Sequence, residues 1–533
     1  MRVLLINTPY ALEENIVPPL SLAYLAGTLE REGIEVQILD FLVSRYSLSK
    51  LRQKLSEYKP HLVGATCTTL TYKVASRILK ACKDFDLDIV TVIGGPHVSF
   101  MIDDTLISAP WIDVVAIGEG DRTLVELVRV IEGSRDLRKV DGIAFREEGV
   151  VVRTDPRPYI EDLDKLPLPA RYLLPMAKYR ALGCSITMIT SRGCPYNCIF
   201  CSANAMFGKR VRFRDPGLVV DEIEMLDRDF DFLQINIVDD TFTANHKHAG
   251  QVCEEILRRN IRTKWSAYAR VDTMTKELAE LMKRAGCTWV VFGVESADEG
   301  ILKTIKKGIT LDKVRSGVKI ATEAGIKVFN SFIFGLPGET PDTARKSMSF
   351  AKELEYKYGA SFGFHILAPM PGTVIYERAK EYGIRFLTRN WEHYDANRVV
   401  TEIPTISVQM VNEAMAIYNQ NVEIAQQEIK RRAKEGDSDY IAMVLGQEKQ
   451  EFIWNLIKHD VLDGLGKITL AKEFDLSEAE AELSRRISLK LKRPIEIVQR
   501  QISELLKEGL LQLQPDGDGL KWLWSDGRRP GLH

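Results

Sequence analysis

The sequence has no long apolar run, few cysteines and almost no net charge, and each absence excludes a class of protein. No apolar stretch in the 533 residues approaches the roughly 18 that a membrane-spanning helix needs, and the run Val3–Ile6 is interrupted too early for a signal peptide. Eight cysteines are too few for a disulfide scaffold at this length. With 72 Lys and Arg against 74 Asp and Glu, we expect neither a nucleic-acid coat nor a polybasic membrane anchor. These features predict a cytoplasmic globular protein.

The first 145 residues alternate short apolar strands with amphipathic helices. Such alternation predicts an α/β domain with a doubly wound, Rossmann-like parallel sheet. A sheet of this kind binds its ligands at the carboxyl ends of its strands. The predicted strands are Val3–Ile6, Val36–Leu39, Leu62–Ala65, Ile89–Ile93 and Val114–Ile117.

Small residues and glycines follow several of these strands, which suits a broad, flat ligand that the backbone approaches closely. Tight strand-to-helix turns are the alternative explanation, but at four strand ends together a bound cofactor is the better one. The candidate cofactor contacts at these ends are Thr8, Pro9, Thr68, Thr69, Gly94, Gly95, His97, Gly118, Glu119 and Gly120.

Residues 146–180 are predicted to be a linker, because prolines interrupt any helix there. A second strand–helix alternation follows. Six such units over residues 181–385 predict a partial or complete TIM-like barrel, with its chemistry at the carboxyl ends of the strands. The predicted strands are Ile186–Thr190, Gln234–Val238, Lys264–Tyr268, Trp289–Gly293, Val328–Phe334 and Phe362–Leu367.

Residues 386–533 lose this alternation. A long helix over Val408–Lys434 is followed by shorter helices, one of them at Leu470–Glu473, and by a hairpin within Leu510–Trp524. This order resembles a winged helix-turn-helix. From Lys467 onward there are 12 Lys and Arg against 11 Asp and Glu, so the basic face that a DNA reader needs is not expected. We expect a substrate lid or a protein-partner module, and no duplex nucleic acid.

Three cysteines, Cys194, Cys198 and Cys201, follow the first barrel strand with the spacing C-x3-C-x2-C. Three thiolates on one loop can hold three irons of a [4Fe–4S] cluster and leave the fourth iron open to a small molecule. Structural zinc is the alternative, but it normally takes four protein ligands. A distant fourth ligand stays possible at this point, and so does a chance grouping of three free cysteines.

The C-x3-C-x2-C motif, with Phe200 just before the third cysteine, resembles the radical S-adenosylmethionine (SAM) superfamily. The resemblance implies that the open iron binds the amino and carboxylate groups of SAM. Electron transfer then cleaves SAM to a 5′-deoxyadenosyl radical, so a reductant such as flavodoxin or ferredoxin is implied as well.

The strand ends of the barrel carry further candidate SAM contacts. The resemblance implies that Asp239 or Asp240 meets the SAM amino group, with a helix N-cap as the alternative role. It further implies that Arg270 reaches the carboxylate, Glu295 the ribose hydroxyls and Gly335 the adenine side.

A doubly wound domain before such a barrel resembles the cobalamin-binding radical SAM subfamily, class B methyltransferase-like. The segment Pro18-Pro19-Leu20 adds Leu20 to the candidate cobalamin contacts. The D-x-H-x-x-G motif that supplies a histidine below cobalt is absent, because His61 and His97 lie in no such motif. We therefore expect a cobalamin without a histidine ligand, with a degenerate domain that binds nothing as the alternative.

The resemblance implies an enzyme that transfers a methyl group, by way of methylcobalamin, to an unactivated carbon of a small organic substrate. A cyclase or rearrangement enzyme with the same cofactors is the close alternative. An RNA-modifying methylthiotransferase would need three more cysteines in the first domain, which has only Cys67 and Cys82. A cobalamin sensor without catalysis is disfavoured by the intact cysteine motif.

The sixth barrel strand bears on the substrate. Either Phe362, Phe364 and Ile366 or Gly363, His365 and Leu367 face the barrel interior, because alternate side chains point inward. Both sets predict a mostly apolar pocket.

Overall fold

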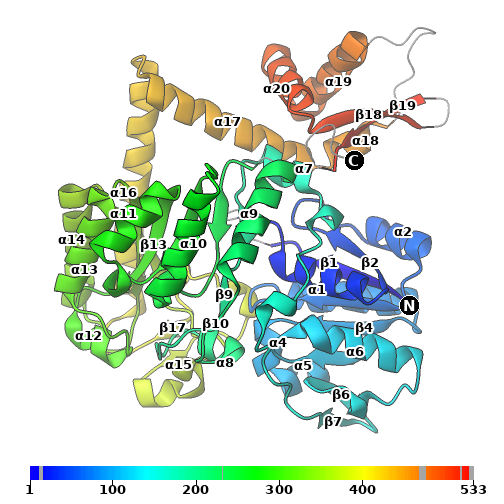
Figure 1. Ribbon diagram of the computed structural model, residues 1–533, viewed down its shortest axis with the longest axis horizontal. Coiled ribbons are helices and arrows are strands. Elements are labelled where there is room, and N and C mark those ends of the chain that lie inside the picture. The colour runs from blue at the N-terminus through cyan, green and yellow to red at the C-terminus, as the bar shows by residue number, and fades with distance from the viewer. Residues whose placement is uncertain (11–15, 231, 467–475, 517–518, 527–533) are drawn as a thin grey trace.

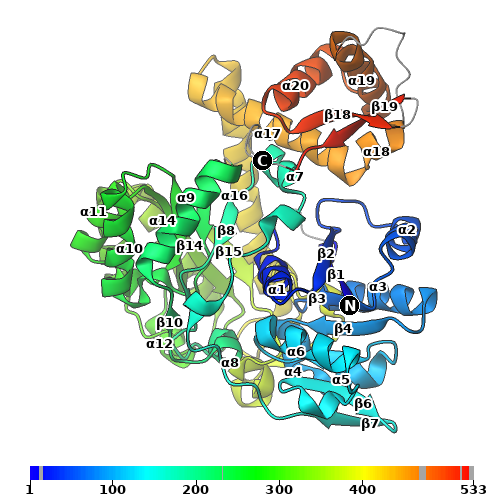
Figure 2. The same cartoon turned by 45° about the vertical axis from the view of Figure 1, so that its right-hand side comes forward.

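The computed structural model describes residues 1–10, 16–230, 232–466, 476–516 and 519–526. An N-terminal sheet domain lies beside a barrel-like domain, and a C-terminal helical module lies above both (Figures 1 and 2). No helix in the described part of the chain is long and apolar enough to cross a membrane.

The N-terminal sheet has seven strands in the order β2-β1-β3-β4-β5-β6-β7. The first five run parallel, which confirms the doubly wound sheet. The strands are β1 (Arg2–Asn7), β2 (Glu35–Asp40), β3 (Leu62–Thr66), β4 (Val90–Gly94), β5 (Val114–Ala116), β6 (Ile143–Glu147) and β7 (Val150–Arg153).

The sheet continues beyond residue 145, where the sequence predicts a linker. An antiparallel hairpin, β6–β7, joins the edge of β5. Its turn is formed by Glu148 and Gly149, both with positive φ. A glutamate in the left-handed region is uncommon, so this turn carried no recognisable sequence signal.

Helices cover both faces of this sheet. One apolar core packs under α1 and α6, and a second packs under α2, α3 and α5 on the other face. The short helices α4 and α5 were not predicted. The helices are α1 (Leu20–Arg31), α2 (Leu48–Tyr58), α3 (Tyr72–Phe85), α4 (Pro96–Phe100), α5 (Ile102–Ser108) and α6 (Gly120–Glu132).

The second sheet has six parallel strands in chain order, β8-β11-β12-β13-β14-β15, which confirms a partial, open barrel. Its strands are β8 (Ile186–Met188), β11 (Ile235–Ile237), β12 (Trp265–Ala269), β13 (Cys287–Glu295), β14 (Lys327–Phe334) and β15 (Ser361–Ile366). Its helices are α9 (Pro216–Phe230), α10 (His246–Arg258), α11 (Lys276–Arg284), α12 (Glu299–Thr304), α13 (Leu311–Glu323) and α14 (Pro341–Tyr358).

A small antiparallel pair closes the cysteine loop. Strand β9 (Ser191–Arg192) pairs with β10 (Arg212–Phe213), so the two ends of the loop between them lie next to each other. The loop contains α8 (Ala203–Phe207). Further short elements are α7 (Met176–Ala181), α15 (Val374–Glu377), β16 (Arg385–Phe386) and β17 (Thr401–Glu402).

The C-terminal module begins with α16, whose bounds match the prediction. Lys449 of α17 pairs with Glu504 and Glu508 at α20. The predicted helix Leu470–Glu473 lies outside the described residues. The elements are α16 (Val408–Lys434), α17 (Ser438–Lys458), α18 (Val461–Leu465), α19 (Leu476–Leu491), α20 (Ile495–Lys507), β18 (Leu511–Asp516) and β19 (Gly519–Trp524).

Candidate cofactor sites

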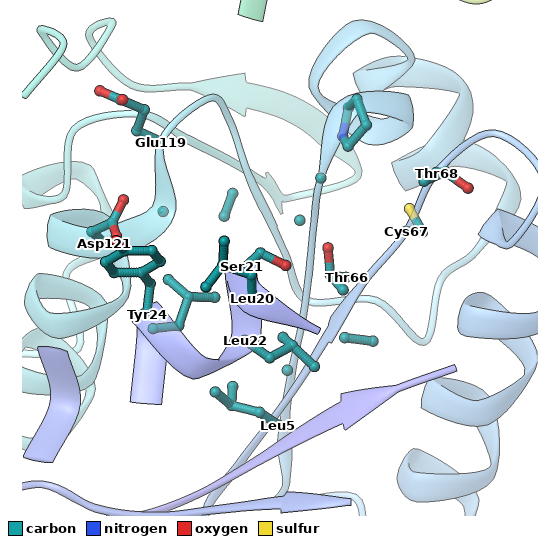
Figure 3. A pocket seen from close by; sticks show the side chains of 18 of the residues that line it. Leu5, Leu20, Ser21, Leu22, Tyr24, Thr66, Cys67, Thr68, Glu119 and Asp121 are labelled. Atoms are coloured by element: carbon teal, nitrogen blue, oxygen red, sulfur yellow. The ribbon is translucent and has the colours of Figure 1, made fainter. Parts of the chain in front are cut away.

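A cavity of about 530 Å³ opens at the carboxyl edge of the N-terminal sheet, within the usual size of a small-molecule site. Figure 3 shows side chains from β1, from α1 and from the segments after β3 and β5 around it. The predicted contacts that line it are Thr8, Leu20, Thr68, Gly94, Gly95, Gly118, Glu119 and Gly120. Pro9, Thr69 and His97 are not among its lining residues.

Small residues inside the strands form the deeper wall of this cavity. Gly64 of β3, Val92 of β4 and Ala116 of β5 line the cavity together with Leu22 of α1. The residue patterns at the strand ends do not reveal these positions. Glycine inside an apolar strand, as at Gly64, is the signal that could have found this wall.

Gly95 lets the backbone line the cavity closely. Its φ of +106° is open to glycine but strained for other residues. A Cβ atom at Gly95 would lie 2.3 Å from the carbonyl oxygen of Cys67. The cavity thus has the backbone-lined walls that a large planar cofactor needs.

His97 is buried in the domain core and is not among the residues that line the cavity, so its role as a cofactor contact stays a prediction. Its Nδ1 lies 3.2 Å from the Thr69 hydroxyl, and its ring packs against Tyr72 and Trp391. Burial lowers the pKa of His97 to about 4. Among the described residues that line the cavity there is no histidine.

The barrel domain supplies the opposite wall of the cavity. Arg192 of β9 lines it and donates to Asp121 (2.9 Å) and Glu119 (3.1 Å) of the sheet domain. Arg212 of β10 donates to both oxygens of Glu119 at 3.0 Å. All four side chains are at least about nine-tenths buried. Further lining residues from this side are Ile189, Ser191, Met206, Phe207, Val238 and Asp240.

The three motif cysteines lie on the loop that starts directly after Arg192. All three are free thiols, with Cys194 and Cys198 half-buried and Cys201 exposed. Burial raises the pKa of the half-buried Cys194 and Cys198 thiols, so metal binding has to displace their protons. Within the described ranges, no three His, Cys, Asp or Glu side chains converge closely enough to hold a single metal ion. A [4Fe–4S] cluster needs one thiolate at each of three separate irons, which this donor set can supply.

Asp239 anchors the start of this loop, and its expected contact with SAM stays a prediction. Its two oxygens accept hydrogen bonds from the backbone and hydroxyl groups of Thr190 and Ser191, at 2.6 to 3.2 Å. The neighbouring Asp240 is exposed and lines the cavity. Desolvation, followed by the charge of Asp239, raises the pKa of Asp240.

Arg270 is also fully engaged within the protein. It donates to both oxygens of Asp272, at 2.9 and 3.0 Å, and to the Lys307 carbonyl at 2.8 Å. Its guanidinium stacks 3.7 Å from the ring centre of Tyr196, which lies between Cys194 and Cys198. In this structure Arg270 thus holds the cysteine loop, and its expected contact with the SAM carboxylate stays a prediction.

Glu295 forms a buried ion pair that the sequence analysis missed. Lys307 donates to its Oε1 at 2.7 Å, and the Lys307 ammonium lies 5.8 Å from the ring centre of Phe200. Gly293 leaves the room for this pair, because a Cβ atom there would lie 2.3 Å from Glu295 Oε1. The pair joins the end of β13 to the cysteine loop. No local pattern marked Lys307, which lies 12 residues from its partner.

Gly335 follows β14 with a φ of +83° and donates its backbone N–H to Glu339. Glu339 is fully buried, and its Oε1 has no hydrogen-bond partner. Burial raises the pKa of Glu339 to about 8. A protonated carboxyl at this position stabilises the turn that follows the fifth barrel strand.

Two family models match the chain over the domains just described. The B12 binding domain matches residues 12–128, and the Radical SAM superfamily matches residues 188–351. These ranges contain the cavity-lining loops of the first sheet and the cysteine loop of the second.

Related proteins match most of the chain. An uncharacterized methyltransferase of Pyrococcus horikoshii is 37% identical over 75% of this chain and 86% of its own length. The anaerobic magnesium-protoporphyrin IX monomethyl ester cyclase of Rubrivivax gelatinosus is 34% identical over 66% of each chain. The structure of the radical SAM methyltransferase TsrM from Kitasatospora setae, with cobalamin and a [4Fe–4S] cluster bound, superposes with a TM-score of 0.65 at 23% identity. It covers 78% of this chain and 90% of that one.

A B12-type sheet domain beside a radical SAM barrel defines the class of this protein. The chain belongs to the B12-binding radical SAM family. The cofactors of this family are cobalamin, SAM and a [4Fe–4S] cluster.

Proposed function

We propose that this protein is a cobalamin-dependent radical SAM methyltransferase that acts on a carbon atom of a small organic substrate. One observation carries the proposal: the cavity of the sheet domain and the cysteine loop share a wall. Ser191 and Arg192 line the cavity, and Cys194 follows two residues later. The methyltransferase relatives support this assignment.

The residues present fit the three cofactors. Cys194, Cys198 and Cys201 would hold the cluster, and the glycine-lined cavity would hold cobalamin. Asp240 at its mouth would meet the SAM amino group. When bound, the cluster supplies the electron that cleaves SAM, and the corrin supplies a methyl carrier. An external reductant such as flavodoxin or ferredoxin would reduce the cluster.

The barrel interior favours a neutral substrate with polar groups. Phe362 and Phe364 contact Tyr418 of α16, so their side chains face that helix. Gly363 and His365 lie on the opposite face of β15. His365 is exposed there.

The neighbouring strands continue that face with more polar groups than the sequence predicted. Gln234 donates to Ser266 at 2.7 Å, and Ser266 donates to Asn236 at 3.1 Å. Tyr268, in the central strand β12, is 43% exposed. We therefore propose a substrate with hydrogen-bonding groups and a planar or aromatic part, in place of a wholly apolar one.

The decisive experiment measures iron and SAM cleavage under anaerobic, reducing conditions. The reconstituted protein should hold about four irons per chain, as a [4Fe–4S] cluster requires, and should release 5′-deoxyadenosine. Cys198→Ala should lose both, whereas Cys184→Ala, at a half-buried cysteine outside the motif, should keep both. Full iron content and SAM cleavage in Cys198→Ala would contradict the assignment.

The cyclase relative makes ring formation a second candidate. SAM with a deuterium-labelled methyl group separates the two reactions. A methyltransferase delivers that label to its product, whereas a cyclase forms product without it.

The absence of a histidine from the described cavity lining predicts the state of the bound cofactor. Electron paramagnetic resonance of the Co(II) form should show no nitrogen superhyperfine splitting. A nitrogen triplet would show that a base occupies the lower face of cobalt.

A further inference from the structure

Five consecutive residues, Thr190 to Cys194, serve both cofactor sites. Ser191 and Arg192 form part of the cavity wall. Cys194 begins the metal-binding motif, and Gly193 between them has a φ of +104°. This short segment is held by side chains from both domains.

The barrel side holds the segment through Asp239, whose four hydrogen bonds all go to Thr190 and Ser191. The sheet-domain side holds it through Arg192, which bonds Asp121 and Glu119. The exposed fractions of these last three side chains are 11%, 6% and 4%. Removing one partner of an ion pair as buried as these lowers the stability of the protein by several kcal/mol, whereas removing one partner of an exposed pair costs little.

The residues that bind Arg192 are themselves part of the cavity. Glu119 and Asp121 line it, and so does Tyr24, whose ring centre lies 5.5 Å from the guanidinium of Arg192. A cofactor that fills the cavity contacts this group and restricts its side chains. Because Cys194 follows Arg192 by two residues, restricting Arg192 also limits the conformations of the segment that carries Cys194.

We propose that Arg192, with Asp121 and Glu119, couples the two cofactor sites energetically, so that each cofactor binds more tightly when the other is present. Such coupling is reciprocal, because both orders of binding lead to the same final complex. Arg192 acts here as a positioning residue. The inference rests on the proposed function only in requiring that both cofactors bind.

The test measures cobalamin binding to two forms of the full-length protein. One form has had its iron removed by a chelator, and the other carries the reconstituted cluster. Equilibrium dialysis with hydroxocobalamin gives the dissociation constant of each form. We expect the cluster to tighten cobalamin binding at least about fivefold, at the lower end of common coupling factors. Cobalamin should in turn raise the chelator concentration that removes half of the iron.

Two conservative variants locate the coupling. Asp121→Asn keeps the size of the side chain but removes its charge, and Arg192→Lys keeps a charge but loses the two-sided geometry. In both variants, the cobalamin dissociation constants of the two forms should differ by less than about twofold. The control is Glu161→Gln, because Glu161 pairs with Arg210, at the other end of the cysteine loop, through side chains that are 65% and 81% exposed. The control should keep the wild-type factor.

Equal affinity of the two wild-type forms would overturn the proposal without any variant. Undiminished coupling in both variants would overturn the role of Arg192. If hydroxocobalamin bound to neither form, the proposed function would fail as well. If both forms bound hydroxocobalamin with equal affinity, by contrast, only the proposed coupling would be wrong.

Discussion

The two parallel sheets of this protein both place a site at the carboxyl ends of their strands, but they build it from different material. At the first sheet, Gly94, Gly95 and Gly118 present backbone to a cavity. At the second, the rim consists of paired charges, Arg270 with Asp272 and Lys307 with Glu295. A planar cofactor is bound by close approach of backbone, whereas an exposed cluster loop needs side chains to hold its shape.

The difference predicts how each site fails. A site lined by backbone is destroyed by an added side chain, because the surrounding backbone cannot move to make room for it. A site held by charge pairs is destroyed by removing one partner, because the other is left buried without compensation. The predictions below separate these two kinds of failure.

The largest loss is expected on the barrel side, at Glu222. This carboxylate is fully buried between Arg171 (2.7 Å) and Arg214 (2.5 Å), which ties α9 to the segments before β8 and after β10. Glu222→Ala leaves two buried guanidinium groups unpaired, and should lower the free energy of unfolding by about 3–5 kcal/mol. Denaturant unfolding of the apoprotein measures this loss.

Glu255 provides the matched control. It also pairs with two arginines, Arg258 and Arg259, but at the surface of α10. Glu255→Ala should cost less than about 1 kcal/mol. Similar losses in the two variants would show that burial does not decide the strength of these ion pairs.

The sheet side should fail at Gly95. A Cβ atom there meets the backbone carbonyl of Cys67, and the φ of +106° is itself unfavourable for alanine. Gly95→Ala should therefore cost about 3 kcal/mol of stability and most of the cobalamin binding. Gly118→Ala is the comparison, because its φ is +73° but no atom lies within 4 Å of the added Cβ. It should cost about 1 kcal/mol and leave cobalamin bound, as equilibrium dialysis would show.

A smaller and pH-dependent effect is expected at Glu339. The pKa of its buried carboxyl is raised from 4.5 to about 8, so the folded protein keeps a proton that the unfolded chain releases. Stability contributed by this group is full below about pH 4.5, falls as the pH rises through that window and is lost above about pH 8. Glu339→Gln should flatten this dependence by up to a few kcal/mol, since each pKa unit corresponds to about 1.4 kcal/mol. Parallel pH profiles for both proteins would contradict the assignment.

Sequence patterns predicted the parts of this fold that depend on local order. The six barrel strands, helix α16 and the cysteine motif each carry a periodicity or a spacing. The patterns could not show which partner a polar side chain finds. Arg270 and His97 stand at strand ends where a ligand is expected, yet Asp272 binds the first and Tyr72 covers the second.

The missed features share one physical cause. Lys307 and the small residues in the cavity wall acquire their roles from contacts between elements that are distant in the chain. Asp239 can accept a hydrogen bond from the backbone of Thr190 only once β8 and β11 lie side by side. Local sequence therefore predicted the strands and their ends, and tertiary packing decided which partner each side chain contacts.

The last prediction separates the two adjacent carboxylates after β11 and carries the smallest expected effect. Asp239 is saturated by four hydrogen bonds, whereas Asp240 is exposed at the cavity. Asp240→Asn removes a charge that would pair with the SAM ammonium. It should raise the KM for SAM about fivefold, equivalent to about 1 kcal/mol, with iron content and melting temperature unchanged. Asp239→Asn should instead lower iron loading and stability, because a neutral amide accepts fewer of the four hydrogen bonds. If Asp239→Asn changed only KM, or Asp240→Asn released iron, the two roles assigned to these carboxylates would have to be exchanged.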